Sequence, residues 1–172
     1  CFPDHNGVGF GHIGYADALR FSSNTFFYQV GVGAGSKALK RAADQLGFQQ
    51  KTGIEIGWEE SVGLVGDETW AAAGRGWAKP GTVPWIPEDM ASASIGQSVV
   101  QITPLQLARA YSVFANGGWL VTPHLAQGTT DWLDADHRRK VPMKASTLAT
   151  IRAGLRKVVS AGTGCGLHGQ GI

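Results

Sequence analysis

The sequence is poor in cysteine and has no long apolar run. Its two cysteines, Cys1 and Cys165, cannot build the framework of a disulfide-stapled domain, and neither has the paired spacing of a zinc site. The five histidines lack the His-x-x-x-His spacing that places two metal ligands on one helical face. No stretch approaches the roughly 18 consecutive apolar residues of a membrane-spanning helix. We therefore expect no metal, no cofactor and no membrane span in this chain.

The chain also has little excess charge of either sign. Fifteen basic and thirteen acidic residues give a formal net charge of +2, and the one basic cluster is the short run at residues 138–140. Nucleic-acid-binding domains carry a basic patch or stripe, so this balance argues against a nucleic-acid partner. We expect residues 138–140 to lie in a solvated loop of mixed charge.

The length of 172 residues fits a single domain or part of one. The chain begins at Cys1 rather than at a methionine, and it stops at Ile172 without a charged or polar tail. We therefore expect residues 1–172 to be a partial domain that is truncated at both ends. Any membrane anchor is expected to lie outside this chain.

Helical periodicity dominates what is present. It predicts five helices, at residues 15–21, 25–30, 37–46, 104–115 and 146–160. Gly31 is expected to stop the second helix, and Ser36 to cap the third. Thr103 as a cap and Pro104 at the first helical position mark the start of the fourth.

Helix 104–115 and the last helix each carry an apolar stripe that bears on how this chain packs. The stripe of helix 104–115, which we expect to be buried, comprises Leu107, Ala108, Tyr111, Phe114 and Ala115. The stripe of the last helix includes Leu148, Ile151, Leu155 and Val158. If this chain lacks the sheet against which that helix packs, these side chains are expected to be exposed or paired with another copy.

Strand signals are few, at residues 53–57, at residues 121–125 and near Val141. Residues 58–90 are rich in Gly, Trp and Pro and have no sustained period. We expect Trp70, Trp77 and Trp85 to be buried there and to hold this long segment together. The alternative is that they are exposed and form a groove that binds sugars or peptides. A helical block with so few strands favours part of a larger α/β domain.

The tripeptide Ser22-Ser23-Asn24 lies at the junction of the first two predicted helices. Ser-x-Asn alone arises often by chance, because both residues are common in caps and turns. It is set within Ala18-Leu19-Arg20-Phe21-Ser22-Ser23-Asn24-Thr25-Phe26-Phe27-Tyr28. The blocks that follow in order are Thr52-Gly53-Ile54-Glu55, Ser94-Ile95-Gly96-Gln97-Ser98, Thr103-Pro104-Leu105-Gln106-Leu107-Ala108 and Ala115-Asn116-Gly117-Gly118. From about His12 to its end, the chain thus resembles the transpeptidase domain of class B, monofunctional penicillin-binding proteins.

The resemblance implies the α/β fold of penicillin-binding proteins and serine β-lactamases, of which this chain is mostly the helical part. It implies a peptidoglycan D,D-transpeptidase that binds penicillin and cross-links cell-wall stem peptides by serine acyl transfer. The implied ligands are stem peptides and β-lactams, and other cell-wall synthesis proteins are implied as partners. The implied location is the outer, periplasmic or extracellular face of the bacterial cytoplasmic membrane.

Three signatures form the active site in this family: Ser-x-x-Lys, Ser-x-Asn or Ser-x-Asp, and Lys-Thr-Gly. A serine nucleophile needs a base to take its proton, and the amine leaving group must receive one. By resemblance, Ser22 relays a proton between the lysines of the first and third signatures. Asn24 orients the first lysine and hydrogen-bonds the amide of the bound peptide or β-lactam. Ser23, the variable middle position, is expected to pack or to cap a helix.

Two signatures are not found in this sequence. No Ser or Thr has a Lys three residues later, so we expect the nucleophile to precede Cys1. Lys51-Thr52-Gly53 spells the third signature, but we interpret it as a chance match to that signature. It follows a helix, and its Thr52-Gly53-Ile54-Glu55 continuation resembles a different family block without a catalytic role. Gly162-Thr163-Gly164 resembles the stretch that precedes the true Lys-Thr-Gly, which we expect after Ile172. This chain alone is therefore predicted to be inactive.

Two further functions remain open at this point. One is a non-catalytic sensor or binding domain that kept the fold and lost the acyl chemistry. The other is a serine β-lactamase, although the Thr-Pro-Leu-Gln and Asn-Gly-Gly blocks resemble the biosynthetic enzymes more closely. Reading the coding sequence on both sides for Ser-x-x-Lys and Lys-Thr-Gly distinguishes the transpeptidase from the non-catalytic domain.

Overall fold

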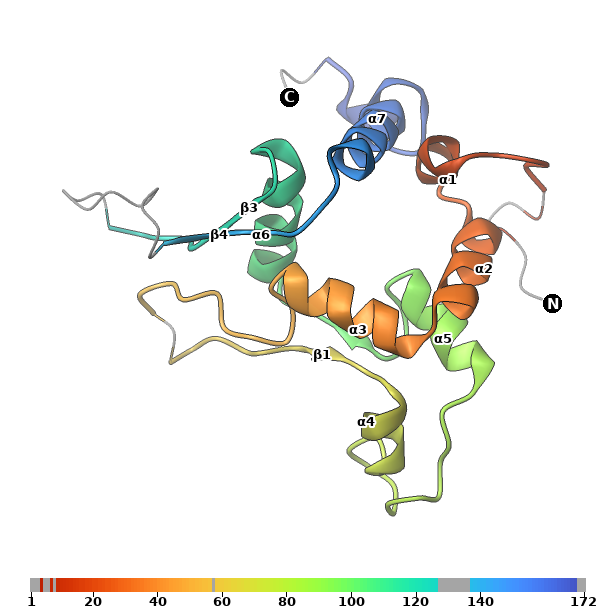
Figure 1. Ribbon diagram of the computed structural model, residues 1–172, viewed down its shortest axis with the longest axis vertical. Helices are drawn as coiled ribbons and strands as arrows, with labels where there is room; N and C mark the ends of the chain where they lie inside the picture. The colour runs from red at the N-terminus through yellow and green to blue at the C-terminus, as the bar shows by residue number, and fades with distance from the viewer. Residues whose placement is uncertain (1–3, 5–6, 8, 57, 127–136, 170–172) are drawn as a thin grey trace.

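The computed structural model describes residues 4, 7, 9–56, 58–126 and 137–169. These residues form seven α-helices, a short 3-10 helix and two two-stranded sheets (Figure 1). The helices are α1 Tyr15–Phe21, α2 Asn24–Ala34, α3 Ser36–Gln45, α4 Glu68–Ala72, α5 Pro87–Ser94, α6 Pro104–Ala115, α7 Ala145–Ala161 and the 3-10 helix η1 Cys165–Leu167. The strands are β1 Leu64–Val65, β2 Val100–Gln101, β3 Trp119–Val121 and β4 Arg138–Lys140.

Helices α1, α2, α3, α6 and α7 are arranged around a ring, α5 lies beside α2, and α4 lies outside the ring (Figure 1). Both sheets are antiparallel pairs, in which Leu64 of β1 faces Gln101 of β2 and Leu120 of β3 faces Arg139 of β4. A small core of Val113, Leu120 and Val141 joins α6 to β3 and the end of β4. The architecture is mostly helical with few strands, as the sequence pattern predicted. Among the described residues, no helix combines the length and apolar character needed to cross a bilayer.

Four of the predicted helices, namely α1, α3, α6 and α7, have nearly the expected bounds, and α6 is the one among them whose N-cap side chain makes a capping hydrogen bond. At α6 the Thr103 hydroxyl accepts a hydrogen bond from the Gln106 backbone N–H at 3.1 Å, and the Gln106 side-chain oxygen accepts one from the Thr103 N–H at 2.9 Å. This reciprocal pair is a capping box. The predicted cap of α3 is wrong, because Gly35 with φ 78° is the N-cap and Ser36 is the first helical residue.

Helix α2 continues past Gly31, where the sequence pattern predicted its end. Gly31 is buried in the middle of the helix, and a Cβ built on it would lie 2.3 Å from the Cβ of Ser94 in α5. The glycine is therefore required by a close helix contact, and it does not stop the helix. Periodicity alone could not distinguish these two uses, because α5 was not predicted.

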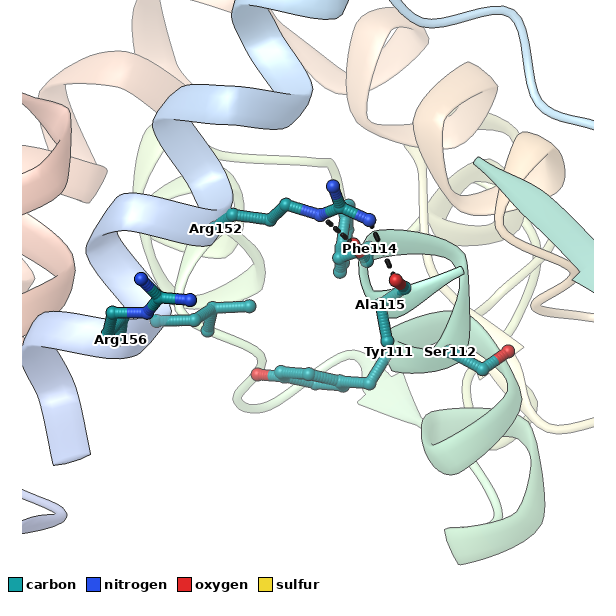
Figure 2. A pocket seen from close by; sticks show the side chains of 7 residues that line it. Tyr111, Ser112, Phe114, Ala115, Arg152 and Arg156 are labelled. Carbon is teal, nitrogen blue, oxygen red and sulfur yellow. Dashed lines mark hydrogen bonds between the residues drawn. The ribbon is translucent and has the colours of Figure 1, made fainter. Parts of the chain in front are cut away.

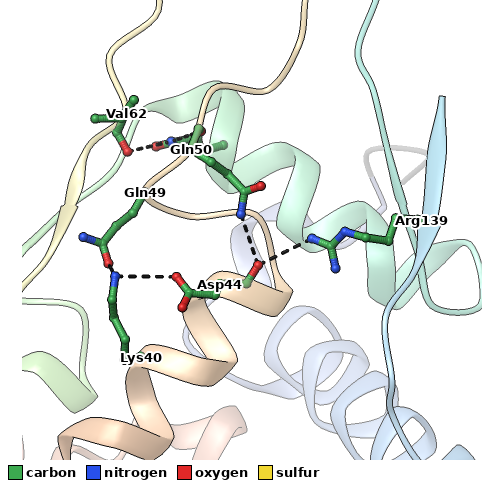
Figure 3. A network of polar contacts seen from close by, with 7 residues as sticks. Lys40, Asp44, Gln49, Gln50, Val62 and Arg139 are labelled. Carbon is green, nitrogen blue, oxygen red and sulfur yellow. Dashed lines mark hydrogen bonds and ion pairs between the residues drawn. The ribbon is translucent and has the colours of Figure 1, made fainter. Parts of the chain in front are cut away.

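Gln106 joins three segments at the start of α6. Its side chain is 1% exposed, and its Nε2 donates hydrogen bonds to the backbone oxygens of Gln50 at 2.9 Å and Val62 at 3.0 Å. Nearby, the Gln50 Nε2 and the Arg139 guanidinium both donate to the backbone oxygen of Asp44, at 3.2 and 3.4 Å (Figure 3). These bonds fix the loop after α3 against α6 and β4.

The loop after α3 does not form the predicted strand. Residues 53–56 are turn and coil, and residue 57 lies outside the described residues. The backbone N–H groups of Thr52 and Gly53 donate to the carboxylate of Glu60 rather than to a neighbouring strand. These N–H groups are thus bonded to a side-chain carboxylate, and not to the backbone of a second strand as the alternating pattern suggested.

The basic run at residues 138–140 is also not the loop that its charge suggested. It forms β4, and the charged ends of Arg138 and Lys140 lie 4.5 and 4.9 Å from the ring centroid of Trp119 on β3. Residues two apart share a face of a strand, so both cations cover the same indole. This cation–π packing favours pairing over solvation.

Residues 66–89 are held by one ion pair rather than by three buried tryptophans. The Arg75 guanidinium donates to both carboxylate oxygens of Asp89, at 2.8 and 2.6 Å, and Arg75 also lies 5.7 Å from the ring centroid of Trp70. Trp70 and Trp85 are half-buried, but Trp77 is 75% exposed. The prediction that Trp77 holds this segment is therefore wrong.

Candidate functional site

The Ser-x-Asn loop is the two-residue turn between α1 and α2. Ser22 is the C-cap of α1, with the left-handed backbone angles φ 51° and ψ 46°. Ser23 is the N-cap of α2, and its hydroxyl accepts a hydrogen bond from the Phe26 N–H at 3.3 Å. The expected capping role of Ser23, which is 1% exposed, is thereby confirmed. Ending one helix and starting the next within two residues leaves the Ser22 side chain on the surface.

A buried carboxylate supports this loop from behind. The side chain of Asp4 accepts hydrogen bonds from the Thr25 N–H at 3.0 Å, the Thr25 hydroxyl at 2.8 Å and the Ser23 hydroxyl at 3.2 Å. Burial raises the pKa of Asp4, but the bonds from Thr25 and Ser23 together outweigh it and lower that pKa. Sequence reasoning missed Asp4, because no spacing or motif connects it to residues about twenty positions later.

The hydroxyl of Ser22 faces the segment that leaves α7. Its Oγ lies 2.9 Å from the Oγ1 of Thr163. The Thr163 N–H donates to the backbone oxygen of Arg20 at 3.3 Å, and the Arg20 Nε donates to the backbone oxygen of Ala161 at 2.9 Å. Three hydrogen bonds therefore connect the end of α1 to residues 161–163, which overlap the Gly162-Thr163-Gly164 stretch expected to precede the third signature.

Helices α1 and α7 pack closely enough to fix this geometry. Gly154 of α7 is buried, and a Cβ there would lie 2.5 Å from the Leu19 Cδ1. A Cβ on Gly162 would lie 2.4 Å from the backbone oxygen of Arg20. The Lys157 ammonium adds an ion pair with Asp17 at 2.7 Å. The two glycines thus permit the approach that places Thr163 beside Ser22.

Ser22 and Asn24 line the same cavity, whose volume is about 700 Å³. Asn24 is the first residue of α2 and is half-buried. Phe27, Tyr111 and Leu155 also line this cavity, and they come from α2, α6 and α7. The predicted site residues are therefore brought together, with a polar edge at the Ser-x-Asn loop and apolar walls beyond it.

The apolar stripes of α6 and α7 line this space and two adjoining cavities of about 630 and 690 Å³. The stripe of α6 is not the buried face that its spacing predicted, since Leu107 is 41% and Tyr111 52% exposed. Its buried residues are instead Gln106, Ala110 and Val113. The stripe of α7 is half-buried rather than fully exposed. The three cavities share lining residues, and we refer to them together as the apolar groove; the shared residues are Leu19, Phe27, Tyr111, Phe114 and Leu155.

A cationic edge borders the apolar groove where α6 ends. The guanidinium of Arg152 donates to the backbone oxygens of Phe114 and, at 2.7 Å, of Ala115, as Figure 2 shows. A cation at this position satisfies carbonyl groups that have no partner within the helix and opposes the negative end of the helix dipole. Arg156 lies one turn further along α7 and faces Tyr111 (Figure 2). Arg152 thus serves to join α7 to α6.

Lys51-Thr52-Gly53 lies in a loop and not on a strand. Thr52 is 2% exposed, and its hydroxyl donates to the Glu60 carboxylate at 2.5 Å. The Glu60 carboxylate therefore holds this loop in a structural role, which agrees with reading the tripeptide as a chance match. No group of His, Cys, Asp and Glu side chains that could hold a metal ion was found among residues 4, 7, 9–56, 58–126 and 137–169.

The structure thus places a Ser-x-Asn turn between two helices and closes it against the end of a long helix on a mostly helical scaffold. The chain belongs to the penicillin binding protein transpeptidase domain family, whose model matches residues 2–171. The resemblance drawn from the sequence and the fold class are both confirmed.

Individual relatives show how much of a longer protein is covered. The chain is 36% identical over 124 residues to peptidoglycan D,D-transpeptidase MrdA of Haemophilus influenzae, covering 72% of this chain and 18% of that protein. It is 30% identical over 173 residues to the MrdA of Acinetobacter baumannii, covering 97% of this chain and 25% of that protein. The PBP2 of Helicobacter pylori, solved in complex with MreC, aligns with a TM-score of 0.77 and 27% identity over 93% of this chain and 28% of its own. The chain thus spans between 18% and 28% of the length of these relatives.

Proposed function

We propose that the protein containing this chain is a peptidoglycan D,D-transpeptidase that binds penicillin and cross-links stem peptides by serine acyl transfer. One observation carries the proposal. The exposed Ser22 hydroxyl is hydrogen-bonded to Thr163 at the edge of the cavity that Asn24 also lines. Membership of the transpeptidase family and the names of the MrdA relatives support it.

Ser22 is the proton relay in this proposal. A hydroxyl can donate one proton and accept two hydrogen bonds, so it can connect two amines without itself becoming ionised. In the acylation step, the lysine of Ser-x-x-Lys takes the proton of the nucleophilic serine. The proton reaches the leaving nitrogen through the Ser22 oxygen, which loses one proton and gains another. Ser22 is therefore unchanged at the end of the step.

Asn24 is the substrate-binding residue in this proposal. An asparagine side chain offers one carbonyl acceptor and two N–H donors. Placed at the first position of α2 and at the edge of the cavity, it can accept a hydrogen bond from a lysine ammonium and donate one to the amide of a stem peptide or β-lactam. A β-lactam occupies the same place because it carries the same amide group.

The relay is tested in the full-length protein with a fluorescent penicillin. Ser22→Ala removes the hydroxyl and is expected to lower the acylation rate constant by roughly a hundredfold or more, the range of proton-transfer catalysis. Ser61→Ala is the matched control, because the Ser61 hydroxyl accepts only a bond from the Gly63 N–H in a distant loop. If Ser22→Ala labels as fast as wild type, the relay role is wrong.

We also propose that the protein acts at the outer face of the bacterial cytoplasmic membrane, held by an anchor outside this chain. Partners among cell-wall synthesis proteins are supported by the complex of the Helicobacter pylori PBP2 with MreC. Labelling of intact cells by a fluorescent penicillin that does not enter the cytoplasm tests the location. Labelling only after lysis would contradict it, and no labelling of the purified protein would favour a non-catalytic domain.

A further inference from the structure

We propose that Thr163 is a positioning residue for the relay, which fixes the orientation of the Ser22 hydroxyl by donating a hydrogen bond to it; this inference rests on the proposed function of Ser22. The two hydroxyl oxygens are 2.9 Å apart. They come from positions 141 residues apart in the sequence, on the turn after α1 and on the segment after α7. Their contact therefore depends on the packing of α1 against α7.

Counting hydrogen bonds decides which oxygen is the donor when the relay operates. The Ser22 hydroxyl has one proton and two acceptor positions. Proton relay uses the O–H toward the group that receives the proton and one acceptor position toward the lysine ammonium that gives it. The second acceptor position is the one that remains, so the partner there must be a donor. The Thr163 hydroxyl meets this requirement at 2.9 Å.

Thr163 is itself held in place, which a positioning residue must be. Its N–H donates to the Arg20 backbone oxygen at 3.3 Å, and Arg20 returns a hydrogen bond from Nε to Ala161 at 2.9 Å. As a β-branched residue, threonine has few χ1 rotamers. Gly162, the preceding residue, has no room for a Cβ against Arg20. The donor is thus held in place by the contacts of residues 161–163 with Arg20.

Ser22 needs such a partner because its side chain is exposed to solvent, so neighbouring atoms do not restrict its rotamers. It is exposed, and its left-handed backbone is uncommon for a residue other than glycine. An unbranched serine side chain has three staggered χ1 rotamers, and only one of them is bonded to Thr163. The contact therefore selects one direction for the hydroxyl before substrate arrives, which lowers the entropic cost of the reactive arrangement.

The test uses full-length protein, a fluorescent penicillin and five variants, two of which, Ser22→Ala and its combination with Thr163→Val, serve for the double-variant comparison. Thr163→Val keeps the β-branch and removes the hydroxyl, and the acylation rate constant is expected to fall about tenfold, as for the loss of one net hydrogen bond. Thr163→Ser keeps the donor and is expected to stay within about threefold of wild type. Thr82→Val is the control, because the Thr82 hydroxyl donates only to the Lys79 backbone oxygen in another loop. Thermal unfolding is measured for every variant.

The double variant Ser22→Ala/Thr163→Val separates positioning from a general structural role. If Thr163 acts through Ser22, the double variant is as slow as Ser22→Ala alone, because no hydroxyl remains to be oriented. Equal slowing by Thr163→Val in both backgrounds overturns the inference, and so does a Thr163→Val rate within twofold of wild type. Near wild-type labelling of Ser22→Ala contradicts the proposed relay itself. The two failures are therefore distinguishable.

Discussion

The hydroxyl groups of Ser22 and Ser23 are adjacent in the chain but have different partners. Ser23 is buried, caps α2 and donates to the Asp4 carboxylate. Ser22 is exposed and contacts Thr163. One serine therefore fixes the backbone of the loop, and the other is left available for chemistry.

Asp4 provides the clearest stability prediction for a single residue. Asp4→Asn weakens the bonds to Thr25 and Ser23, and we expect a loss of about 1–3 kcal/mol at pH 7. Because those bonds lower its pKa, the carboxylate contributes fully above its unfolded pKa of about 4 and loses its contribution as the pH falls through its folded pKa. The difference between wild type and Asp4→Asn should therefore shrink below about pH 4.

Urea unfolding of the full-length protein between pH 3 and pH 7 checks this prediction. Asp44→Asn is the control, because its ion pair with Lys40 is solvent-exposed and such pairs contribute little. A difference between wild type and Asp4→Asn that grows as the pH falls would contradict the sign.

The sequence predicted which residues belong to this site only where those residues are part of a motif. Ser22 and Asn24 were found because five ordered blocks framed them, and Ser23 because serine is a common cap. Asp4 was not predicted, and Thr163 was named only as part of the stretch expected to precede the third signature. Both reach the loop through long-range contacts, which no local pattern encodes.

At the scale of elements, the contact between α2 and α5 depends on a glycine. Gly31→Ala would place a methyl group 2.3 Å from the Cβ of Ser94, so we expect a loss of about 1–3 kcal/mol of stability from overpacking. Gly33→Ala in the same helix meets no atom within 4 Å. It should gain up to about 1 kcal/mol from helix propensity.

The opposite signs make this pair of alanine variants informative, since both remove a glycine from α2. Thermal and urea unfolding of the two variants check the prediction. Stabilisation by Gly31→Ala would show that α2 and α5 are not in close contact.

Element prediction succeeded where local chemistry marks an end and failed where tertiary contacts decide. Thr103 and Pro104 begin α6 as expected, because the capping box is local. The face that α6 buries was not predictable, because it depends on the position of β3. The short helices α4 and α5 lie in a segment stabilised by the Arg75–Asp89 ion pair. An ion pair produces no periodic pattern in the sequence, so these helices were not predicted.

At the scale of the whole molecule, the apolar groove and the Ser-x-Asn loop face the same space. Groove residues from α1, α2, α6 and α7 adjoin Ser22 and Asn24. The fold class and family followed from the sequence, because five motif blocks in order are specific. The presence of an open groove did not follow, because apolar stripes look alike whether they meet a core or a cavity.

In the proposed function, this loop belongs to a serine acyl-transfer site whose nucleophile is another residue. The most direct measurement is peptide mapping by mass spectrometry of the full-length protein after reaction with penicillin. We expect a covalent acyl group on a serine of a Ser-x-x-Lys sequence, and none on Ser22. An acyl group on Ser22, or no acylated serine at all, would contradict it.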